Sequence, residues 1–359
     1  MATHAMATPH VNRIATATPP NDVHNAFIDF ARESLQDDRA RRIFERMAER
    51  SGVSHRFSTF VPAAEPGPAL DTEGFYRRGA FPNTAARMIR YEREATTLAV
   101  RAVERLAPSG ITHLVVASCT GFMAPGLDQR ITDELGLGGH LKRSLVGFMG
   151  CYAAVPALRI AADAVRADPA ARVLVVALEM CTLHLQETSD LETVLSFLIF
   201  GDGAAAALVT ADPYGLALDA FHAATIPGTQ DLITWRIGDQ GFDMYLSGKV
   251  PGAIATALRA EADRNDGEGF LAGQRVEDVA LWAVHAGGRS VLDAVEQGLR
   301  LPGTALSTSR EVLNDVGNVS SATLGFVLER MLAGEQTGPG IAMAFGPGMC
   351  AETVRFTRV

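Results

Sequence analysis

A cysteine lies at the centre of the stretch GFMGCYAAVP, residues 147–156, in a setting that favours nucleophilic chemistry. The apolar run before it predicts the end of a buried strand, and the residues after it predict an apolar helix. Cys151 therefore stands at a helix start, where free N–H groups and the positive end of the helix dipole lower a thiol pKa. We expect it to be the one cysteine with a strongly depressed pKa. The alternative is a small buried hydrophobe, as most free cysteines are.

Two other parts of the chain share one pattern. The apolar runs LVVAS and LWAV are each followed by a polar residue, Cys119 and His285, and then by a glycine two positions later. Cys151 follows Cys119 at nearly the spacing at which Asn318 follows His285, and both are preceded by glycine. This match predicts duplicated halves that each contribute two polar residues to a shared centre. The alternative is chance similarity among strand-to-helix turns.

A thiol, an imidazole and an amide in one centre could make carbon–carbon bonds from thioesters. His285 as an imidazolium would lower the pKa of the Cys151 thiol. His285 and Asn318 would donate N–H groups to a thioester oxygen and stabilise the enolate that forms there. Because loss of CO2 from a malonyl thioester generates the carbanion itself, this chemistry needs no carboxylate base.

The elements that would position these residues alternate between strand and helix, which is typical of α/β layers. Continuous apolar runs predict buried strands, and apolar residues at helical spacing predict helices. The predicted strands are 11–15, 113–118, 172–178, 214–220, 279–284 and 341–344. The predicted helices are 23–36, 37–50, 83–106, 128–135 and 251–265, and residues 65–80 and 221–235 are predicted loops.

Composition narrows the function classes. The four cysteines are scattered without a CxxC pair, which predicts a reducing compartment and no zinc or other metal site. No apolar run reaches the roughly 18 residues of a membrane span, and the first twenty residues lack the apolar core of a signal peptide. We therefore expect a cytoplasmic protein with no membrane span. The net charge of −9 argues against nucleic acid as a partner.

An anionic ligand would need a local basic patch, and one helix offers it. Arg42, Arg46 and Arg50 recur at a spacing of four and would share one face of the predicted helix 37–50. Three arginines in register could hold a diphosphate. The alternative is a solvated face in which Asp38 and Glu49 pair with the row.

Five motifs together resemble the type III polyketide synthases of the chalcone synthase superfamily, from about residue 11 to the end. They are GCYAAVPALRIAADAV, FGDGAAAALV, WAVHAGGRSVLDAV, GNVSSATLGFVLERM and AFGPGMCAET. The resemblance implies an α/β protein of the thiolase fold, with duplicated halves in a five-layered αβαβα arrangement. Residues 1–215 would form the half with the nucleophilic cysteine, and residues 216–359 the half with the histidine and asparagine.

The resemblance also implies an acyltransferase that extends an acyl-CoA starter with malonyl-CoA and needs no cofactor. Cys151 would carry the acyl group, and His285 and Asn318 would assist loading, decarboxylation and condensation. Phe200 would be a gatekeeper between the CoA tunnel and the substrate cavity. The implied substrate pocket comprises Cys119, Cys181, His184, Phe200, Trp235, Met244 and Ser320. The implied CoA site comprises Arg42, Arg46, Arg50, Gly287 and Gly288, and Gly346, Pro347 and Gly348 form the implied scaffold loop. The family pattern further implies a homodimer.

Departures from the family pattern leave the substrate open. Ala286 replaces a proline of the plant enzymes, and Ala124 stands where a methionine commonly reaches into the partner's cavity. Cys119 replaces a cavity threonine, as in bacterial tetrahydroxynaphthalene synthases, and Met244 replaces a second gatekeeper phenylalanine.

The bulk of His184 and Trp235 should narrow the cavity floor. The smaller Cys119 and Cys181 could open a separate tunnel for an aliphatic chain. We therefore favour a fatty-acyl-CoA starter extended to an alkylpyrone or alkylresorcinol. A malonyl-only pentaketide synthase of the tetrahydroxynaphthalene type is the first alternative. A ketoacyl-ACP synthase III and a catalytically silent thiolase-like module are the others; the FGPG loop argues against the former, and the intact Cys151 argues against the latter.

Overall fold

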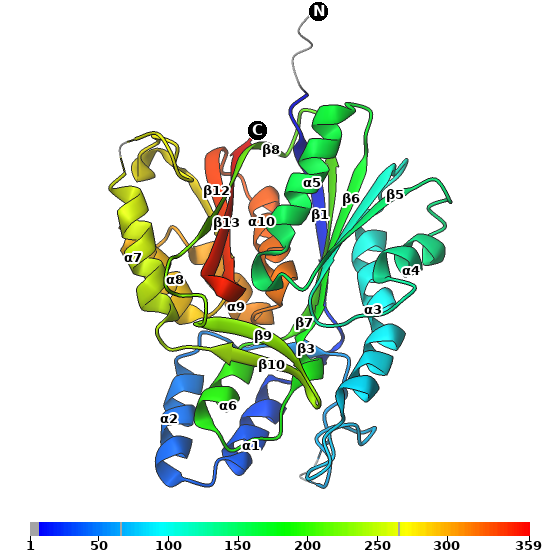
Figure 1. Ribbon diagram of the computed structural model, residues 1–359, viewed down its shortest axis with the longest axis vertical. Helices are drawn as coiled ribbons and strands as arrows, with labels where there is room; N and C mark the ends of the chain where they lie inside the picture. The colour runs from blue at the N-terminus through cyan, green and yellow to red at the C-terminus, as the bar shows by residue number, and fades with distance from the viewer. Residues whose placement is uncertain (1–6, 65–66, 265) are drawn as a thin grey trace, which may run out of the picture.

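The computed structural model of the chain describes residues 7–64, 67–264 and 266–359. Residues 65 and 66, at the start of the predicted loop 65–80, and residue 265, at the end of the predicted helix 251–265, lie outside these residues. In the part that is described, the fold is built on one mixed sheet in the order β11-β12-β13-β8-β1-β7-β6-β4-β5 (Figure 1).

The N-terminal half supplies one side of this sheet. Its parallel strands are β5, β4 and β6, and β7 and β1 complete it in antiparallel directions. The bounds are β1 His10–Ala17, β4 His113–Ser118, β5 Lys142–Gly147, β6 Val173–Met180 and β7 Asp202–Thr210.

The C-terminal half repeats the order and the directions of four of these strands. β11 and β12 are parallel like β4 and β6, while β13 and β8 follow in antiparallel directions like β7 and β1. The bounds are β8 Leu216–Thr225, β11 Leu281–Val284, β12 Gly338–Gly346 and β13 Cys350–Arg358. The two halves join where Val11 of β1 pairs with Leu216 of β8. The predicted duplication is thereby confirmed.

Helices and sheet halves alternate in five layers, as predicted. From right to left in Figure 1, these are α3 with α4, the N-terminal strands, α5 with α10, the C-terminal strands, and α7 with α8. The bounds are α3 Thr84–Leu106, α4 Leu127–Glu134, α5 Ala154–Ala167, α7 Val250–Ala262, α8 Arg289–Leu299 and α10 Thr323–Ala333.

Alternation along the strands explains the layers. In β4 and β6, Leu114 and Leu174 face the cluster that includes α3, while Val115 and Val175 face the cluster that includes α5 and α10. Successive strand residues point to opposite faces, so a strand that is apolar throughout must be covered on both sides. The inner helices α5 and α10 begin just after Cys151 and Asn318, which places both residues at the junction of the halves.

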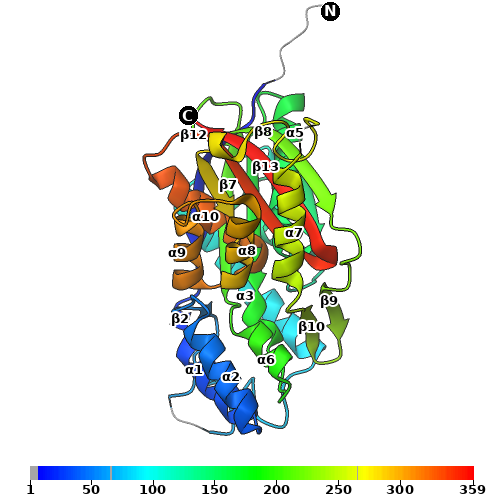
Figure 2. The same ribbon diagram turned by 90° about the vertical axis from the view of Figure 1, so that its left-hand side faces the viewer.

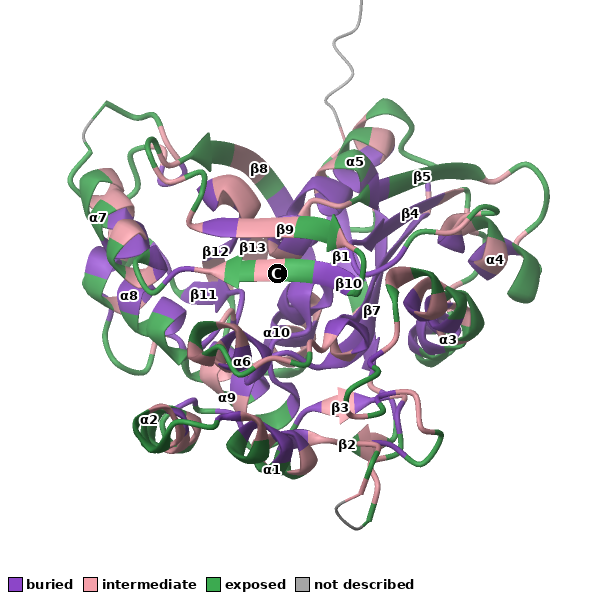
Figure 3. Ribbon diagram, turned by 60° about the horizontal axis from the view of Figure 1, so that its bottom comes forward, coloured by how far each residue is buried: buried purple, intermediate pink, exposed green. Residues whose placement is uncertain are grey.

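The remaining elements gather mostly at one end of the molecule (Figure 2). They include the helices α1 His24–Ser34, α2 Asp38–Glu49, α6 Leu191–Phe197 and α9 Ser307–Val316. The short strands are β2 Asn21–Asp22, β3 Phe57–Ser58, β9 Ile233–Gly238 and β10 Gly241–Leu246. Figure 3 shows α1 and α2 with exposed outer surfaces. Within the described chain, no helix combines the length and apolarity needed to cross a membrane.

The prediction of a loop over 221–235 is wrong. β8 continues to Thr225 because it pairs with β13 as far as Cys350. β9 begins at Ile233 because it forms a hairpin with β10, in which Trp235 lies opposite Met244. β8 is stabilised by pairing with β13, which is distant in the sequence, and β9 by pairing with β10, which follows it. The local sequence pattern of residues 221–235 does not show these pairings.

Candidate active site

Cys151 lies in the 3-10 turn Gly150–Tyr152, between β5 and α5. Gly150 has a φ of 76°, and a Cβ at this position would lie 2.5 Å from Cδ of Pro347. A Cβ on Gly346 would lie 2.7 Å from Cδ1 of Tyr152. The FGPG loop therefore packs directly against the cysteine turn, and only glycine fits at either contact.

His285 follows β11, and its backbone N–H donates to the carbonyl of Met343 at 2.8 Å. Neither ring nitrogen of His285 has a hydrogen-bond partner among the described residues. A Cβ on Gly287 would lie 3.2 Å from Cδ2 of the His285 ring. Gly287 thus leaves room for the ring, and the CoA contact predicted for it stays a prediction.

Backbone contacts on both sides of Asn318 hold it against the segment that contains Phe200. Its N–H donates to the carbonyl of Ile199 at 2.7 Å, and its carbonyl accepts from Gly201 at 3.0 Å. These bonds join the GNVSS motif of one half to the FGDG motif of the other. Asn318 and Phe200 are therefore fixed as neighbours.

Cys151, His285 and Asn318 line one small cavity of about 30 Å³, here called the Cys151 cavity. Phe200, Met244, Gly287 and Gly346 are also part of its wall. The structure thus brings together the three residues that were predicted to react, two of them from the C-terminal half. Gly288, with a φ of 141°, precedes α8 and is not among the lining residues.

The protonation states differ from the sequence prediction. Burial raises the pKa of the Cys151 thiol to about 11, and burial lowers the pKa of His285 to about 3. Both directions are opposite to those expected from the sequence, which predicts a strongly depressed Cys151 pKa beside an imidazolium. Desolvation disfavours the charged form of both groups, and for the partly exposed Cys151 it outweighs the effect of the helix start. These directions favour a neutral thiol and a neutral imidazole as the resting pair.

A buried carboxylic acid stands behind the thiol. The Ser320 hydroxyl lies 3.6 Å from Sγ of Cys151 and 3.4 Å from Sγ of Cys119. Cys119 in turn donates to Glu179 Oε1 at 3.3 Å, and burial raises the pKa of Glu179 to about 7. We did not single out Glu179 from the sequence. The sequence feature that could have identified it is its place as the single acidic residue of the otherwise apolar strand VLVVALEM. A carboxyl group buried in such a strand needs hydrogen-bond donors around it.

A second cavity of about 30 Å³, here called the Trp235 cavity, adjoins the first and shares Cys151, Phe200 and Met244 with it. The indole Nε1 of Trp235 donates to the carbonyl of Cys119 at 2.9 Å, which fixes the ring as a wall. The residues that line the Trp235 cavity include most of the predicted pocket, namely Cys119, Cys181, Phe200, Trp235, Met244 and Ser320. Pro347 of the predicted scaffold loop also lines it.

His184 is an exception, because it lies one layer behind this wall. Its ring is fully buried and stacks on Phe242 with centroids 4.1 Å apart. Its Nε2 lies 2.7 Å from the carbonyl of Thr120, and its Nδ1 accepts from the N–H of Phe242 at 3.0 Å. The prediction that His184 forms the cavity floor is therefore wrong: it supports Trp235, whose ring centroid is 5.4 Å away.

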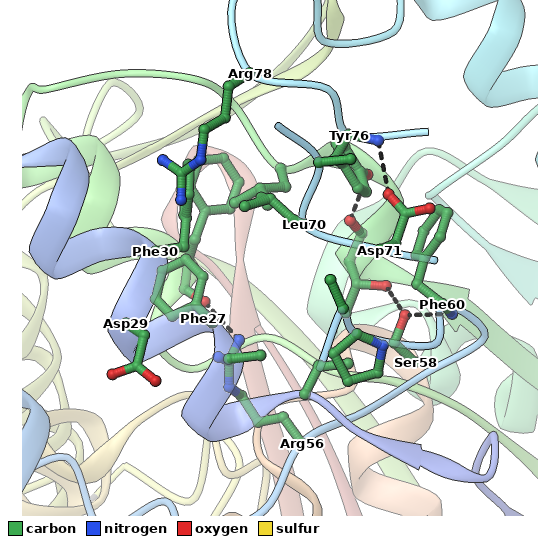
Figure 4. A pocket seen from close by; sticks show the side chains of 18 of the residues that line it. Phe27, Asp29, Phe30, Arg56, Ser58, Phe60, Leu70, Asp71, Tyr76 and Arg78 are labelled. Atoms are coloured by element: carbon green, nitrogen blue, oxygen red, sulfur yellow. Dashed lines mark hydrogen bonds between the residues drawn. The ribbon is translucent and has the colours of Figure 1, made fainter. Parts of the chain in front are cut away.

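A space larger than these two cavities lies on the other side of Cys181. A cavity of about 190 Å³, here called the α1 cavity, shares Cys181, Phe197 and Phe200 with the Trp235 cavity. Figure 4 shows the aromatic and aliphatic side chains that surround it, among them Phe27, Phe30, Phe60, Leu70 and Tyr76. The sequence did not predict this cavity, because the apolar residues of an amphipathic helix are expected to pack in the hydrophobic core.

The predicted arginine row is exposed and unpaired. Arg42, Arg46 and Arg50 are exposed, and none has a carboxylate at ion-pair distance in the described part of the chain. Asp38 pairs instead with Arg41 at 2.9 Å. The alternative, in which Asp38 and Glu49 form ion pairs with these arginines, is therefore not observed in the described part of the chain.

The comparisons with known proteins agree with this geometry. Residues 1–213 match the family described as chalcone and stilbene synthases, N-terminal domain, and residues 218–359 match the corresponding C-terminal domain. The chain belongs to the chalcone and stilbene synthase family. It is a type III polyketide synthase, an acyltransferase-type enzyme.

Three relatives illustrate the match. The alpha-pyrone synthesis polyketide synthase-like Pks18 of Mycobacterium tuberculosis is 31% identical, over 96% of this chain and 90% of the relative. Bisdemethoxycurcumin synthase of Oryza sativa is 33% identical, over 95% and 90%. The crystal structure of PKS-I from the brown alga Ectocarpus siliculosus superposes with a TM-score of 0.86 at 28% identity, covering 99% of this chain and all of that one.

Proposed function

We propose that this polyketide synthase loads an aliphatic acyl-CoA starter on Cys151, extends it two or three times with malonyl-CoA, and releases an alkylpyrone or alkylresorcinol. The observation that carries the proposal is the α1 cavity, which meets the Trp235 cavity at Cys181, Phe197 and Phe200. A largely apolar space of about 190 Å³, reached from Cys151 by way of the Trp235 cavity, suits an alkyl tail. Pks18, a relative named for alpha-pyrone synthesis, supports the same product class.

Loading begins from the neutral pair. The Cys151 thiol gives its proton to a ring nitrogen of His285 as its sulfur bonds to the thioester carbon of the starter. The CoA sulfur then leaves with that proton. Forming a separate thiolate and imidazolium in this buried site would cost free energy. That cost is reduced when the sulfur attacks and the proton transfers in one step, because no separated ion pair accumulates.

Extension uses the same donors on malonyl-CoA. The carbon–carbon bond to the carboxylate breaks, CO2 leaves, and the electron pair passes to the thioester oxygen as an enolate. The amide N–H of Asn318 and an N–H of His285 stabilise that oxygen. The enolate carbon then attacks the acyl carbon on Cys151, expels the cysteine sulfur as a thiolate and leaves the lengthened chain on CoA. The thiolate takes a proton from water, and each further extension begins with transfer of the chain from CoA back to Cys151 as in loading.

The shape of the cavities limits the polyketide end of the product. The hydrogen bond to the carbonyl of Cys119 holds the Trp235 ring in place. Because the surrounding side chains are closely packed, moving the ring to enlarge the cavity would cost free energy. The growing polyketide therefore stops after few additions, while the starter tail extends past Cys181 into the α1 cavity. The malonyl-only pentaketide would leave the α1 cavity unused.

CoA would bind with its phosphates on Arg42, Arg46 and Arg50 and its thioester at the Cys151 cavity. The enzyme would act as a cytoplasmic homodimer. The exposed side chains of Phe122 and Leu145, the latter on the edge strand β5, support an interface there. A dimer mass by light scattering at micromolar concentration is expected, and a monomer would contradict it.

The test of the starter class is an assay with malonyl-CoA and acyl-CoAs from acetyl to stearoyl, plus coumaroyl-CoA, read by mass spectrometry. Cys181→Phe should block the junction of the two cavities and lower kcat/KM for decanoyl to stearoyl starters by about tenfold or more, with acetyl-CoA retained. Cys350→Ser is the matched control, since Cys350 lines neither cavity. A pentaketide formed from malonyl-CoA alone, with no use of long starters, would contradict the proposal.

A further inference from the structure

Arg56, which lies just before β3, is a buried cation that the reaction steps above do not use. It is only 2% exposed, and burial lowers its pKa to about 9, so the guanidinium keeps its proton at neutral pH. The guanidinium lies over the ring of Phe27 at 4.6 Å. Its Nε donates to Nδ1 of His24 at 3.1 Å, and its Nη1 donates to the carbonyls of Phe197 and Phe200 at 2.9 Å each. A buried charge needs such partners, which makes these contacts costly to lose.

The backbone around Phe200 divides its hydrogen bonds between two directions. The carbonyl of Ile199 accepts from Asn318, and the N–H of Gly201 donates to the carbonyl of Asn318. The carbonyl of Phe200, which lies between them, instead accepts from Arg56. A buried carbonyl requires a donor, and here the guanidinium supplies it. Asn318 therefore holds one edge of this segment, and Arg56 holds the other.

The stem of Arg56 also packs against the residue before Asn318. A Cβ on Gly317 would lie 2.9 Å from Cγ of Arg56, so this close approach depends on a glycine. The backbone of Arg56 is itself fixed, because its N–H donates to Oδ1 of Asp22 at 3.3 Å and its carbonyl accepts from Val23 at 2.8 Å. The side chain thus reaches from a fixed base to both segments that meet at Asn318.

We propose that Arg56 is a positioning residue for the release of CO2 from malonyl-CoA. It is not among the residues that line the Cys151 cavity, but it fixes the carbonyl of Phe200, and both Phe200 and Asn318 line that cavity. The inference rests on the proposed function, because it acts through the amide that would stabilise the enolate. A displacement of such a donor by about 1 Å can lower a rate by about a hundredfold.

Loading of the starter should depend on Arg56 much less. It requires Cys151, whose turn packs against Pro347, and His285, whose N–H is bound by the carbonyl of Met343. These supports do not involve Arg56. Loss of the guanidinium should therefore separate decarboxylation from acyl transfer.

A role through the α1 cavity is the alternative, because Arg56 also lines that cavity beside Phe27 (Figure 4). An effect of this kind would act on starters whose chains reach the cavity. Release of CO2 from malonyl-CoA with no starter present involves no such chain. This measurement therefore distinguishes the two roles.

Arg87 provides a matched control. It is fully buried, lies over the ring of Tyr76 at 5.5 Å and donates to the carbonyls of Pro82 and Leu183. Within the described residues, Arg56 and Arg87 also share an Nη2 that has no hydrogen-bond partner. Arg87→Met thus reproduces the loss of a buried, ring-stacked guanidinium without touching the segment that holds Asn318.

The experiment compares Arg56→Met, Arg56→Lys and Arg87→Met with the parent. Arg56→Met should lower the release of CO2 from malonyl-CoA alone by about tenfold or more. Acyl transfer from acetyl-CoA or lauroyl-CoA to Cys151, measured by intact-protein mass, should change by less than about threefold. Arg56→Lys should lose less, because it keeps the charge but offers one ammonium in place of the guanidinium fork. Arg87→Met should leave the ratio of CO2 release to acyl transfer at the parent value.

Hydrogen exchange read by mass spectrometry adds a measurement that needs no substrate. The N–H groups of Gly201 and Asn318 join the two segments, so peptides 197–203 and 316–322 should exchange faster in Arg56→Met, and not in Arg87→Met. A parent that releases no CO2 would contradict the proposed function, and the exchange rates would then decide the role of Arg56.

Three results would overturn the inference: CO2 release at the parent rate in Arg56→Met, equal losses of CO2 release and acyl transfer, or unchanged exchange in both peptides. If thermal unfolding shows that Arg56→Met does not fold, Arg56→Lys takes its place in each comparison.

Discussion

The side-chain Oδ1 of Asn318 accepts a hydrogen bond from the backbone N–H of Ser320 at 2.8 Å. The hydroxyl of Thr323 lies 3.4 Å from the same oxygen, and Nδ2 of Asn318 donates to the carbonyl of Gly287 at 3.4 Å. Because the oxygen end of the amide is engaged within the protein, the second N–H of Nδ2 remains for a substrate. The turn after Asn318 thus orients the group that the proposed decarboxylation needs.

Replacement of Asn318 should separate loading from decarboxylation. Asn318→Asp keeps an oxygen to accept from Ser320 but loses the N–H donor, and loss of one such donor typically lowers a rate by about 10²–10³. We expect an acyl group on Cys151, seen by intact-protein mass, with little CO2 released from malonyl-CoA. Asn318→Ala should behave alike. CO2 release at the parent rate would remove Asn318 from the mechanism.

The pH dependence of alkylation tests the neutral resting pair. With its pKa raised to about 11, Cys151 is mostly thiol at neutral pH, and its thiolate fraction rises about tenfold per pH unit as the pH approaches that value. The rate of iodoacetamide labelling at Cys151 should therefore climb steadily from about pH 7 to pH 10. Cys119 and Cys181, whose pKa burial raises further, should label later.

His285→Ala is the control for that measurement, and it should leave the profile nearly unchanged. A rate in the parent that levels off near pH 6 to 7 would instead reveal a thiolate–imidazolium pair. Such a plateau would support the sequence-based prediction of a depressed Cys151 pKa.

The arginine row should control CoA affinity without changing the chemistry. Arg42→Ala/Arg46→Ala should raise KM for malonyl-CoA and lower its salt sensitivity, with kcat nearly kept, because exposed charges act through screened attraction. Arg41→Ala is the matched control, since Arg41 is already paired with Asp38. An unchanged KM would mean that CoA does not contact this row.

Much of the fold followed from the sequence, because the motifs mark where strands end and helices begin. The repeated pattern around Cys119 and His285 predicted the duplication, and the order of the strands bears it out. The hairpin of β9 and β10 was missed, because its strands are short and pair only with each other. It nevertheless decides the site, since its cross-strand pair of Trp235 and Met244 lines the cavity beside Cys151.

The sequence could not predict how deeply the site residues are buried or which distant segments pack around them. The position of Cys151 at a helix start indicated a low pKa, but the depth of its burial, which depends on packing from both halves, reverses the direction. The family resemblance implied that His184 lines the pocket, and only its contacts with Phe242 and Thr120 show that it lies behind the cavity wall. The α1 cavity arises between segments far apart in the chain, so no local pattern predicts it.

The last prediction concerns Trp235, whose indole donates to the carbonyl of Cys119. Trp235→Gly should enlarge the Trp235 cavity and shift the products to longer polyketides with every starter. Trp235→Phe should shift them less, because it keeps most of the volume and loses only the hydrogen bond. Removing a large packed side chain can cost several kcal/mol, about 3–5 for Trp to Ala in a core, so thermal unfolding must show that both variants remain folded. If both variants and the parent give identical products by mass spectrometry, Trp235 does not limit the chain, and the end of extension must be sought in the α1 cavity.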